Sequence, residues 1–295
     1  MSLVIALYVR EGIVIASDSR LTLTSTTQLA PTLVQQQGQQ TQPDSPVRHQ
    51  DQQGQPLQQV QQPIVQQTLQ QVAVGQSDST YKTFLTPRHV GISTYGDADI
   101  QGVPITGYIE SFINEELPQS YEVDDVPPKL LDYFKALPGP PGVSFFVAGY
   151  KTQAGSRREP YVYRVDVAQD SIHQENAGGV QGAAWGGEID TLMRLIQPLG
   201  TMDDQGNFSP VPYYQIPWGF FTLQDAIDYA LYAVRATIDS IRFQPRAKTV
   251  GGPIDVLVIK PDGAFWVQRK ELHGESQQLA NVARTAKRDN SATGG

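Results

Sequence analysis

The first twenty residues contain two short apolar runs separated by a tight turn. Leu3 to Val9 and Ile13 to Ser17 each have the length of a strand, and Glu11-Gly12 lies between them. A hairpin of this kind returns the chain to its starting point. Asp18, the first residue after the second run, is therefore expected beside Ser2.

Ser2 is a candidate nucleophile, because removal of Met1 would give it a free α-amine and a hydroxyl within one residue. A hydroxyl attacks poorly until a base takes its proton, and an α-amine with a pKa of about 7.7 to 8.0 is partly unprotonated near neutral pH. Positive charge nearby lowers that pKa further. A small second residue also permits methionine removal in proteins of any function, so other residues must decide between these interpretations.

Composition argues against several classes of function. The chain has 295 residues and a formal net charge of -8, which favours neither nucleic acid nor an anionic membrane as a partner. It has no cysteine, which excludes disulfides, thiolate metal sites and cysteine nucleophiles. Its four histidines lack metal-ligand spacing, so we expect no metal and no other cofactor. No apolar run has the length of a membrane span or a signal-peptide core, so a cytoplasmic protein is expected.

The sequence predicts one folded domain over residues 1–270, interrupted by a Gln-rich insert at 30–78 and followed by a polar tail at 271–295. Between Val34 and Gln76 the chain is dominated by Gln with scattered Pro, Val and Thr. This composition buries too little apolar surface to offset the entropy of ordering, so a flexible insert is expected. The alternative is a Gln-rich helix, which would be broken by Pro43, Pro46, Pro56 and Pro63.

Outside the insert, apolar periodicity predicts blocks of strands separated by pairs of helices. Expected strands lie at 80–85, 89–95, 143–150, 161–167, 172–175, 254–259 and 264–267, and expected helices at 98–117, 127–137, 190–197 and 223–243. Thr222 and Asp225 are expected to cap the last helix. The Gly-rich passage at 178–187 indicates close backbone packing, without the spacing of a nucleotide-binding loop. This order fits an α+β protein, a four-layer αββα sandwich of two antiparallel sheets between helical layers.

Several residues stand at the joints of this order: Ser2, Gly12 in the first turn, Ala16 to Arg20 after the second strand, Lys82 and Gly96 around the second hairpin, and Val250 to Val267 after the last helix. With these joints the chain resembles the proteasome β-subunit family of N-terminal nucleophile (Ntn) hydrolases, especially the bacterial proteasome-like group of Anbu and HslV. Ser2 stands where that family has its N-terminal Thr. The resemblance covers nearly all of the chain outside the insert and the tail.

The resemblance implies that Ser2 Oγ attacks an amide carbonyl while the α-amine of the same residue relays the proton. Lys82 would stand beside Oγ as a cation held by Asp18. The backbone N–H of Gly96, where a strand meets a helix, would stabilise the oxyanion. Arg20 and Ser19 are implied as supporting groups. The implied specificity pocket is small, mostly apolar and uncharged, and consists of Leu21, Thr80, Phe84, Thr94 and Ala98.

Two positions depart from the family pattern. Active members carry a Ser in a Gly-Ser-Gly context where this chain has Gln181-Gly182-Ala183-Ala184, and an Asp with a second Ser near the position of Arg246 to Val250. In the family these groups support the terminal amine through hydrogen bonds. Thr249 is the candidate substitute in this chain.

Three functions remain open from the sequence. The first is a proteasome-like endopeptidase that cleaves peptides or unfolded proteins as a homo-oligomeric ring or open ring, with an ATP-dependent unfoldase as a partner of unknown identity. The second is a weak or inactive assembly subunit, in which Asp18 and Lys82 form an ordinary structural ion pair. The third is an amidohydrolase for small amides. The insert connects Arg20 to Lys82 and is therefore expected near the mouth of the site.

Overall fold

The structure is a computed structural model that describes residues 2–28, 32–33, 65–66, 69–152 and 157–271. The chain divides into two compact units, one of residues 1–23 with 73–295 and the other of residues 24–72. Most of the predicted insert and nearly all of the predicted tail lie outside the described residues. The candidate site residues all belong to the first, larger unit.

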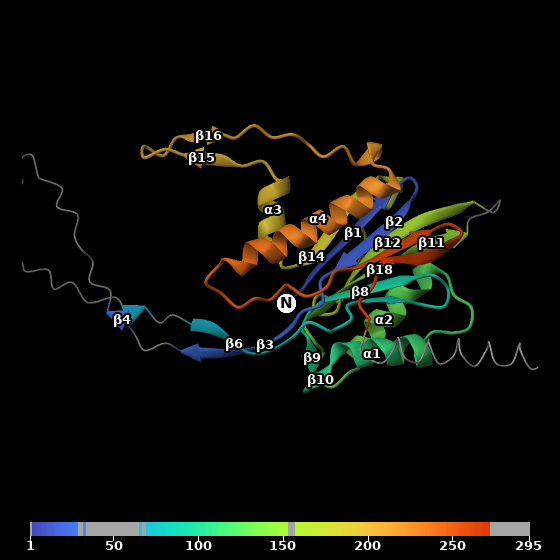
Figure 1. The fold of residues 1–295 in the computed structure, drawn as a ribbon. Coiled ribbons are helices and arrows are strands. Elements are labelled where there is room, and N and C mark those ends of the chain that lie inside the picture. The colour runs from blue at the N-terminus through green and yellow to red at the C-terminus, as the bar shows by residue number, and fades with distance from the viewer. Residues whose placement is uncertain (1, 29–31, 34–64, 67–68, 153–156, 272–295) are drawn as a thin grey trace, which may run out of the picture. The chain divides into compact units, whose positions relative to one another are not determined.

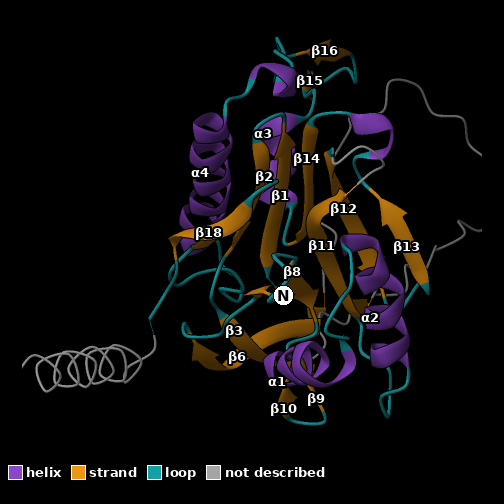
Figure 2. Ribbon diagram, turned by 90° about the vertical axis from the view of Figure 1, so that its right-hand side faces the viewer, coloured by secondary structure: helices purple, strands orange, loops and turns teal. Residues whose placement is uncertain are grey.

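Two five-stranded antiparallel sheets form the centre of the larger unit (Figures 1 and 2). The first sheet has the order β14 (Gly182–Gly187), β1 (Leu3–Val9), β2 (Gly12–Ser17), β17 (Asp255–Lys260) and β18 (Gly263–Gln268). The second has the order β13 (Ser171–Gln174), β12 (Arg158–Asp166), β11 (Val143–Thr152), β8 (Gly91–Gly96) and β7 (Thr83–Leu85). The predicted opening hairpin is confirmed, and it lies in the middle of the first sheet.

The remaining elements connect or flank these sheets. The helices of the described residues are α1 (Ile105–Ser111), which continues as a π-helical segment (Phe112–Glu116), α2 (Val126–Lys135), α3 (Asp190–Ile196), α4 (Leu223–Arg242), and three short 3-10 segments (Val123–Asp125, Ala177–Gly179 and Trp218–Phe220). Short strands pair as β9 (Asp99–Ile100) with β10 (Val103–Pro104), β15 (Gly200–Met202) with β16 (Phe208–Pro210), β3 (Leu21–Gln28) with β6 (Leu69–Ser77), and β4 (Thr32–Leu33) with β5 (Val65–Gln66). Among the described residues, no helix combines the length and apolarity needed to cross a membrane.

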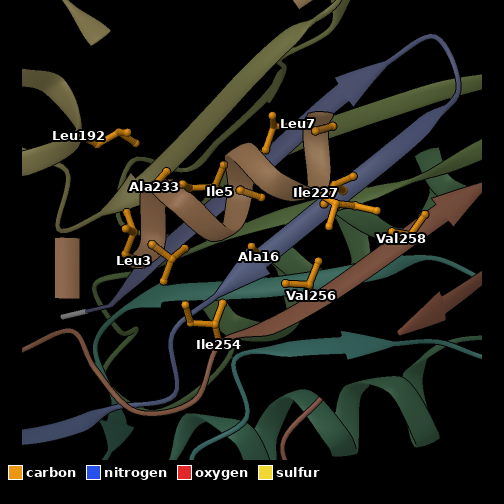
Figure 3. Close-up of a cluster of buried hydrophobic side chains, with 14 of the residues drawn as sticks. Leu3, Ile5, Leu7, Ala16, Leu192, Ile227, Ala233, Ile254, Val256 and Val258 are labelled. Carbon is orange, nitrogen blue, oxygen red and sulfur yellow. The ribbon is translucent and has the colours of Figure 1, made fainter. Parts of the chain in front are cut away.

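Three buried apolar clusters hold the larger unit together. The first joins the first sheet to α3 and α4 through Leu3, Ile5 and Leu7 of β1 (Figure 3). The second joins the second sheet to α1 and α2, and the third contains Val4 and Ala6 of β1 together with Phe146 and Ala148 of β11. Because successive strand side chains point to opposite faces, both faces of β1 are buried. The predicted mixed fold with antiparallel sheets is confirmed.

The capped long helix is confirmed in detail. Thr222 Oγ1 accepts a hydrogen bond from Asp225 N at 3.2 Å, and the Asp225 carboxylate accepts one from Thr222 N at 2.8 Å. Two of the four unpaired N–H groups at the helix start gain partners in this way. Ala226, Ile227 and Ala230 form a buried apolar stripe on one face of the helix, which directs α4 onto β1 and β2.

One expected helix starts later than predicted, and several strands were not predicted. The passage from 178 to 187 contains β14, because Gly186 and Gly182 leave room for aromatic rings: an added Cβ would lie 2.2 Å from Tyr95 and 3.1 Å from Tyr8. The helix expected from 98 begins only at Ile105, after β9 and β10. The segment between α3 and α4 contains β15 and β16, which the sequence did not predict. In addition, β4, β5 and β6 give regular structure to parts of the predicted insert.

Candidate active site

Ser2 lies just before β1 and is 8% exposed. Its carbonyl oxygen accepts a hydrogen bond of 2.7 Å from the N–H of Glu188, the residue that follows β14. Gly187 permits this approach, because its φ of +92° is open to glycine and an added Cβ would lie 1.7 Å from Ser2 O. The start of the chain's first strand is thus fixed between β2 and β14.

Asp18 follows β2 and is fully buried. Its Oδ1 accepts hydrogen bonds from Leu3 N at 3.0 Å and Lys82 Nζ at 2.7 Å. Its Oδ2 accepts from Arg20 N at 3.1 Å and Gly251 N at 3.0 Å. Four donors therefore hold one buried carboxylate, which is the condition under which a charged carboxylate is tolerated in a protein interior.

Lys82 precedes β7, and its side chain is 4% exposed. Burial lowers the pKa of Lys82 below its ordinary value, while the Asp18 carboxylate opposes that shift. Because the ammonium group and the Asp18 carboxylate are 2.7 Å apart, the pair is joined by a charge-assisted hydrogen bond. A lysine in these conditions can lose or share a proton more readily than a lysine on the surface.

Gly96 ends β8 with a φ of +112°, and an added Cβ would lie 2.3 Å from Gly142 O. The neighbouring Asp97 N–H donates to Gly142 O of the segment before β11, whereas Thr94 N–H donates to Lys82 O. Backbone N–H groups alternate in direction along an antiparallel strand. The N–H of Gly96 therefore points away from β11, toward the side on which Lys82 lies.

Two of these residues, Ser2 and Lys82, line a small cavity, whereas Asp18 and Gly96 are not among its lining residues. Its volume is about 10 Å³, room for the centre of a single water molecule. The lining residues are Ser2, Arg20, Leu21, Thr80, Lys82, Thr94, Tyr95, Asp97, Ala98 and Ile105. Within the described part of the chain, the buried Thr94 hydroxyl has no hydrogen-bond partner. The cavity therefore holds one polar atom that a water or a ligand would satisfy.

The expected pocket differs from the observed cavity in two respects. Phe84 does not line it but packs against the cluster of α1 and α2, because Thr83 points toward the first sheet and the next side chain points the other way. The cavity is also not uncharged, since Arg20 and Asp97 line it together with Lys82. The helix expected directly after Gly96 begins nine residues later, so its dipole does not act at the Gly96 N–H.

The predicted supporting residues Ser19 and Arg20 follow Asp18 and fix the chain on its C-terminal side. Ser19 Oγ donates to Pro253 O at 2.6 Å, and Ser19 N donates to Gly251 O at 3.0 Å. Arg20 forms a bidentate ion pair with Asp78, with distances of 2.6 and 2.7 Å. Gly251 has no side chain because the Arg20 guanidinium occupies that space. Through Arg20, Asp78 joins this group of charged residues, and the sequence had not predicted Asp78 as a member of the site.

Glu188 is a second residue that the sequence argument missed. Its carboxylate is buried and accepts a hydrogen bond from Arg246 Nη1 at 3.0 Å and from Thr249 Oγ1 at 3.2 Å. Thr249, the predicted substitute, therefore contacts the carboxylate of a residue whose backbone pairs with Ser2. The available signal was the strand β14 itself: once Gly182–Gly187 is paired with β1, Glu188 stands opposite Ser2.

A chain of buried hydroxyl groups links the two sheets behind Lys82. Ser17 Oγ lies 2.8 Å from Thr83 Oγ1, which lies 2.8 Å from Ser93 Oγ, and Ser93 Oγ donates to Lys82 O at 3.1 Å. These contacts fix the backbone of Lys82 against both sheets. The chain of hydroxyl groups was not foreseen because its members are distant in sequence.

Asp255 and Lys270 form a second buried ion pair. Asp255 begins β17 and lies directly opposite Ser17 of the adjacent strand β2. Lys270 donates to Asp255 through its ammonium group and, at 2.8 Å, through its backbone N–H. The ammonium group also lies 4.3 Å from the ring centroid of Tyr81, a cation–π contact. Burial lowers the pKa of Lys270. In the described ranges, no group of His, Asp and Glu has the arrangement of a metal site.

The arrangement has the parts that acyl transfer requires. Ser2, which carries a hydroxyl, lines the same cavity as Lys82, whose pKa is lowered by burial, and the backbone N–H of Gly96 points away from β11. Such an N–H group is suited to an oxyanion, and a cation beside a hydroxyl lowers the cost of proton removal. A buried aspartate keeps the lysine in place.

Comparison with known proteins identifies a fold. No protein-family model matches the chain, and no curated protein matches it in sequence. The two antiparallel sheets with their few helices relate the chain to proteasome-like proteins at the level of the fold. A solved structure with this likeness is the Gly-1 mutant of Anbu from Hyphomicrobium sp. strain MC1, with a TM-score of 0.51, 14% identity, and coverage of 99% of this chain and 97% of that chain.

Proposed function

We propose that this protein is a proteasome-like Ntn hydrolase that cleaves peptide bonds with Ser2 after removal of Met1. The observation that carries the proposal is the meeting of Ser2 and Lys82 at one cavity, with Asp18 bonded to Lys82 and the N–H of Gly96 directed to the same side. Three separate segments supply these groups. The Anbu-like fold supports the same class.

The proposed reaction has two stages. Ser2 Oγ bonds to the substrate carbonyl carbon while its proton passes to the Ser2 amine, and the carbonyl π pair becomes an oxyanion that the Gly96 N–H binds. The oxyanion then collapses, the C–N bond breaks, and the leaving nitrogen takes the proton from the ammonium. Water attacks the resulting ester by the same route in reverse. As a neighbouring cation, Lys82 stabilises the negative charge that develops on Ser2 Oγ when its proton leaves. The Asp18 carboxylate holds Lys82 in place.

The proposal includes the finer fold and the assembly. The three apolar clusters support a four-layer αββα arrangement in one domain over 1–270, with the insert at 30–78 and the tail at 271–295 outside it. We also propose a homo-oligomeric ring or open ring in the cytoplasm, with peptides or unfolded proteins as substrates and no cofactor.

The test uses protein whose N-terminal Ser2 has been verified by intact mass. A mixed peptide library is incubated with the wild type, with Ser2→Ala and with Ser2→Thr, which keeps both the hydroxyl and the amine. We expect cleavage by the wild type and the Thr variant and its loss in the Ala variant. Equal product from the wild type and Ser2→Ala would refute Ser2 as the nucleophile.

Two other functions have a specific observation in their favour. Exposed apolar side chains between 195 and 220, among them Met202, Phe208 and Phe220, favour an assembly subunit without catalysis. The 10 Å³ cavity favours an amidohydrolase for small amides. A retained Met1 in the mature protein would support the first of these, and turnover of small amides without peptide cleavage would support the second.

A further inference from the structure

Glu188 is the residue opposite Ser2 on the neighbouring strand. The β1–β14 pairing places Leu3 against Gly187 and continues with the hydrogen bond of 2.7 Å from Glu188 N to Ser2 O. Directly opposed residues in an antiparallel pair have Cα atoms about 4.5 to 5.5 Å apart. Glu188 therefore begins within one side-chain length of the Ser2 amine.

The approach of the two strand ends leaves no freedom in this placement. An added Cβ at Gly187 would overlap the Ser2 carbonyl oxygen, so the segment is held against Ser2 by its backbone. Both Ser2 and the Glu188 side chain are nearly excluded from solvent, at 8% and 5% exposure. Charge on Glu188 is therefore weakly screened where the Ser2 amine lies.

The known partners of Glu188 do not use all of its acceptor capacity. Oε1 accepts from Arg246 and Oε2 accepts from Thr249. An ionised carboxylate has about four lone-pair sites, so each oxygen keeps one site for a further donor. The Arg246 side chain is 33% exposed, so solvent reaches the outer side of this ion pair.

The charged groups around Ser2 come from several elements. Arg20, Lys82 and Asp97 line its cavity, and Asp18 forms an ion pair with Lys82. Glu188, which is paired with Arg246, follows β14, the strand next to β1. On the side of β14, Glu188 is the acidic residue that lies opposite Ser2 by backbone pairing. Asp18 already accepts four hydrogen bonds and is committed to Lys82.

We propose that Glu188 is a positioning residue for the Ser2 α-amine, orienting its lone pair and stabilising the ammonium that forms when the amine takes the Ser2 proton. This inference rests on the proposed function of Ser2. It assigns to Glu188 and Thr249 together the support that the sequence lacks at Gly182 and Ala183. The carboxylate comes from the end of β14, and the hydroxyl that holds it comes from the segment after α4.

The experiment compares two substitutions that change the local charge in opposite directions. Glu188→Gln removes a negative charge while keeping the shape, so the pKa of the amine falls and the acid limb of the kcat profile moves to lower pH by about one unit. Arg246→Met removes the compensating cation at a partly exposed position, so the limb moves to higher pH. We expect kcat of Glu188→Gln to fall on the order of tenfold or more, with partial rescue by Glu188→Asp.

The matched control is Glu175→Gln. Glu175 is also a glutamate of low exposure in an ion pair, with Arg164 at 2.6 Å. Its backbone carbonyl, however, accepts a hydrogen bond from the Tyr8 hydroxyl, at the far end of β1 from Ser2. The control is expected to leave the acid limb in place. Melting temperature and far-UV circular dichroism establish that each variant is folded, and Arg246→Met decides the question if Glu188→Gln does not fold.

A readout without activity separates this inference from the proposed function. The rate at which acetic anhydride acetylates the Ser2 amine, followed by peptide mass spectrometry across pH, gives the pKa of that amine directly. Opposite shifts in Glu188→Gln and Arg246→Met support the inference even if the wild type cleaves no peptide, a result that would overturn only the proposed function. An unshifted amine in both variants would overturn the role of Glu188 while leaving Ser2 in place.

Discussion

The molecule contains two buried lysine–aspartate pairs, Lys82 with Asp18 and Lys270 with Asp255, and their surroundings differ. Asp18 and Asp255 are both fully buried, and burial lowers the pKa of both Lys82 and Lys270. Lys82, however, lines a cavity together with Ser2, whereas the Lys270 ammonium is covered by the ring of Tyr81. Buried charge is thus not by itself evidence of a reactive site. The neighbouring hydroxyl and the space for a ligand make the difference.

The carboxylates of the two pairs also differ in their backbone donors. Asp18 accepts from three backbone N–H groups besides Lys82. In the described part of the chain, Asp255 accepts from one backbone N–H, that of Lys270 itself. The first carboxylate is therefore held without its lysine, which leaves Lys82 free for chemistry. The second depends on its lysine for structure.

The largest expected effect breaks the first pair. Lys82→Met should lower kcat/KM for peptide cleavage by about 10²- to 10⁴-fold, because the cation beside Ser2 Oγ is lost. The three remaining N–H donors of Asp18 should keep the protein folded. Single-turnover cleavage of a fluorogenic peptide by the wild type and the variant measures the effect. Unchanged cleavage would mean that Lys82, like Lys270, has only a structural role.

Breaking the second pair should have the opposite outcome. Lys270→Met leaves the buried Asp255 carboxylate with one donor and should lower the free energy of unfolding by about 3 to 5 kcal/mol. Activity per folded molecule should change by less than about twofold, since Lys270 does not line the cavity. Urea unfolding measures the first quantity, and cleavage at low temperature the second. A larger loss of stability in Lys82→Met than in Lys270→Met would contradict the comparison.

The lowered lysine pKa values predict a dependence of stability on pH. Between the lowered pKa of the native state and the ordinary value of 10.5, the unfolded lysines keep protons that the native ones have released. The unfolded state then binds more protons, so the free energy of unfolding rises with pH across that window. Urea unfolding at a series of pH values up to 10.5 tests this. The rise should shrink in the double variant Lys82→Met with Lys270→Met.

The smallest expected effect concerns the outer ion pair. Asp78 is 43% exposed and Arg20 is 20% exposed, so solvent screens their interaction. Asp78→Asn should change the free energy of unfolding by no more than about 1 kcal/mol, as judged by urea denaturation. A loss comparable to that of Lys270→Met would mean that the exposed pair carries structural weight like the buried one.

The sequence predicted those parts of the fold whose signals are local. The opening hairpin and the capped α4 are determined by short apolar runs and by the Thr222–Asp225 pair. β14 was missed because Gly and Ala dominate Gly182–Gly187. The rings of Tyr95 and Tyr8 pack where side chains of Gly186 and Gly182 would otherwise lie. No local pattern carries that information.

The candidate site divides in the same way. The joints Ser2, Asp18, Lys82 and Gly96 were named from their spacing and from a family resemblance. Glu188 and the hydroxyl chain through Thr83 were not, because each depends on strands brought together from distant positions. The charge in the cavity was also missed, since Asp97 enters it through its own contact with Gly142 rather than through a motif.

The pairing of β1 with β14 has a consequence for the order of events during synthesis. Ser2 is covered by Gly187 and Glu188, which leave the ribosome long after the first strand does. At about 5 to 20 residues per second, the N-terminus stays uncovered for roughly ten to forty seconds. On the proposed mechanism, Met1 must therefore be removed within that interval, before the sheet closes. The proposed nucleophile would thus depend on the order of synthesis and folding.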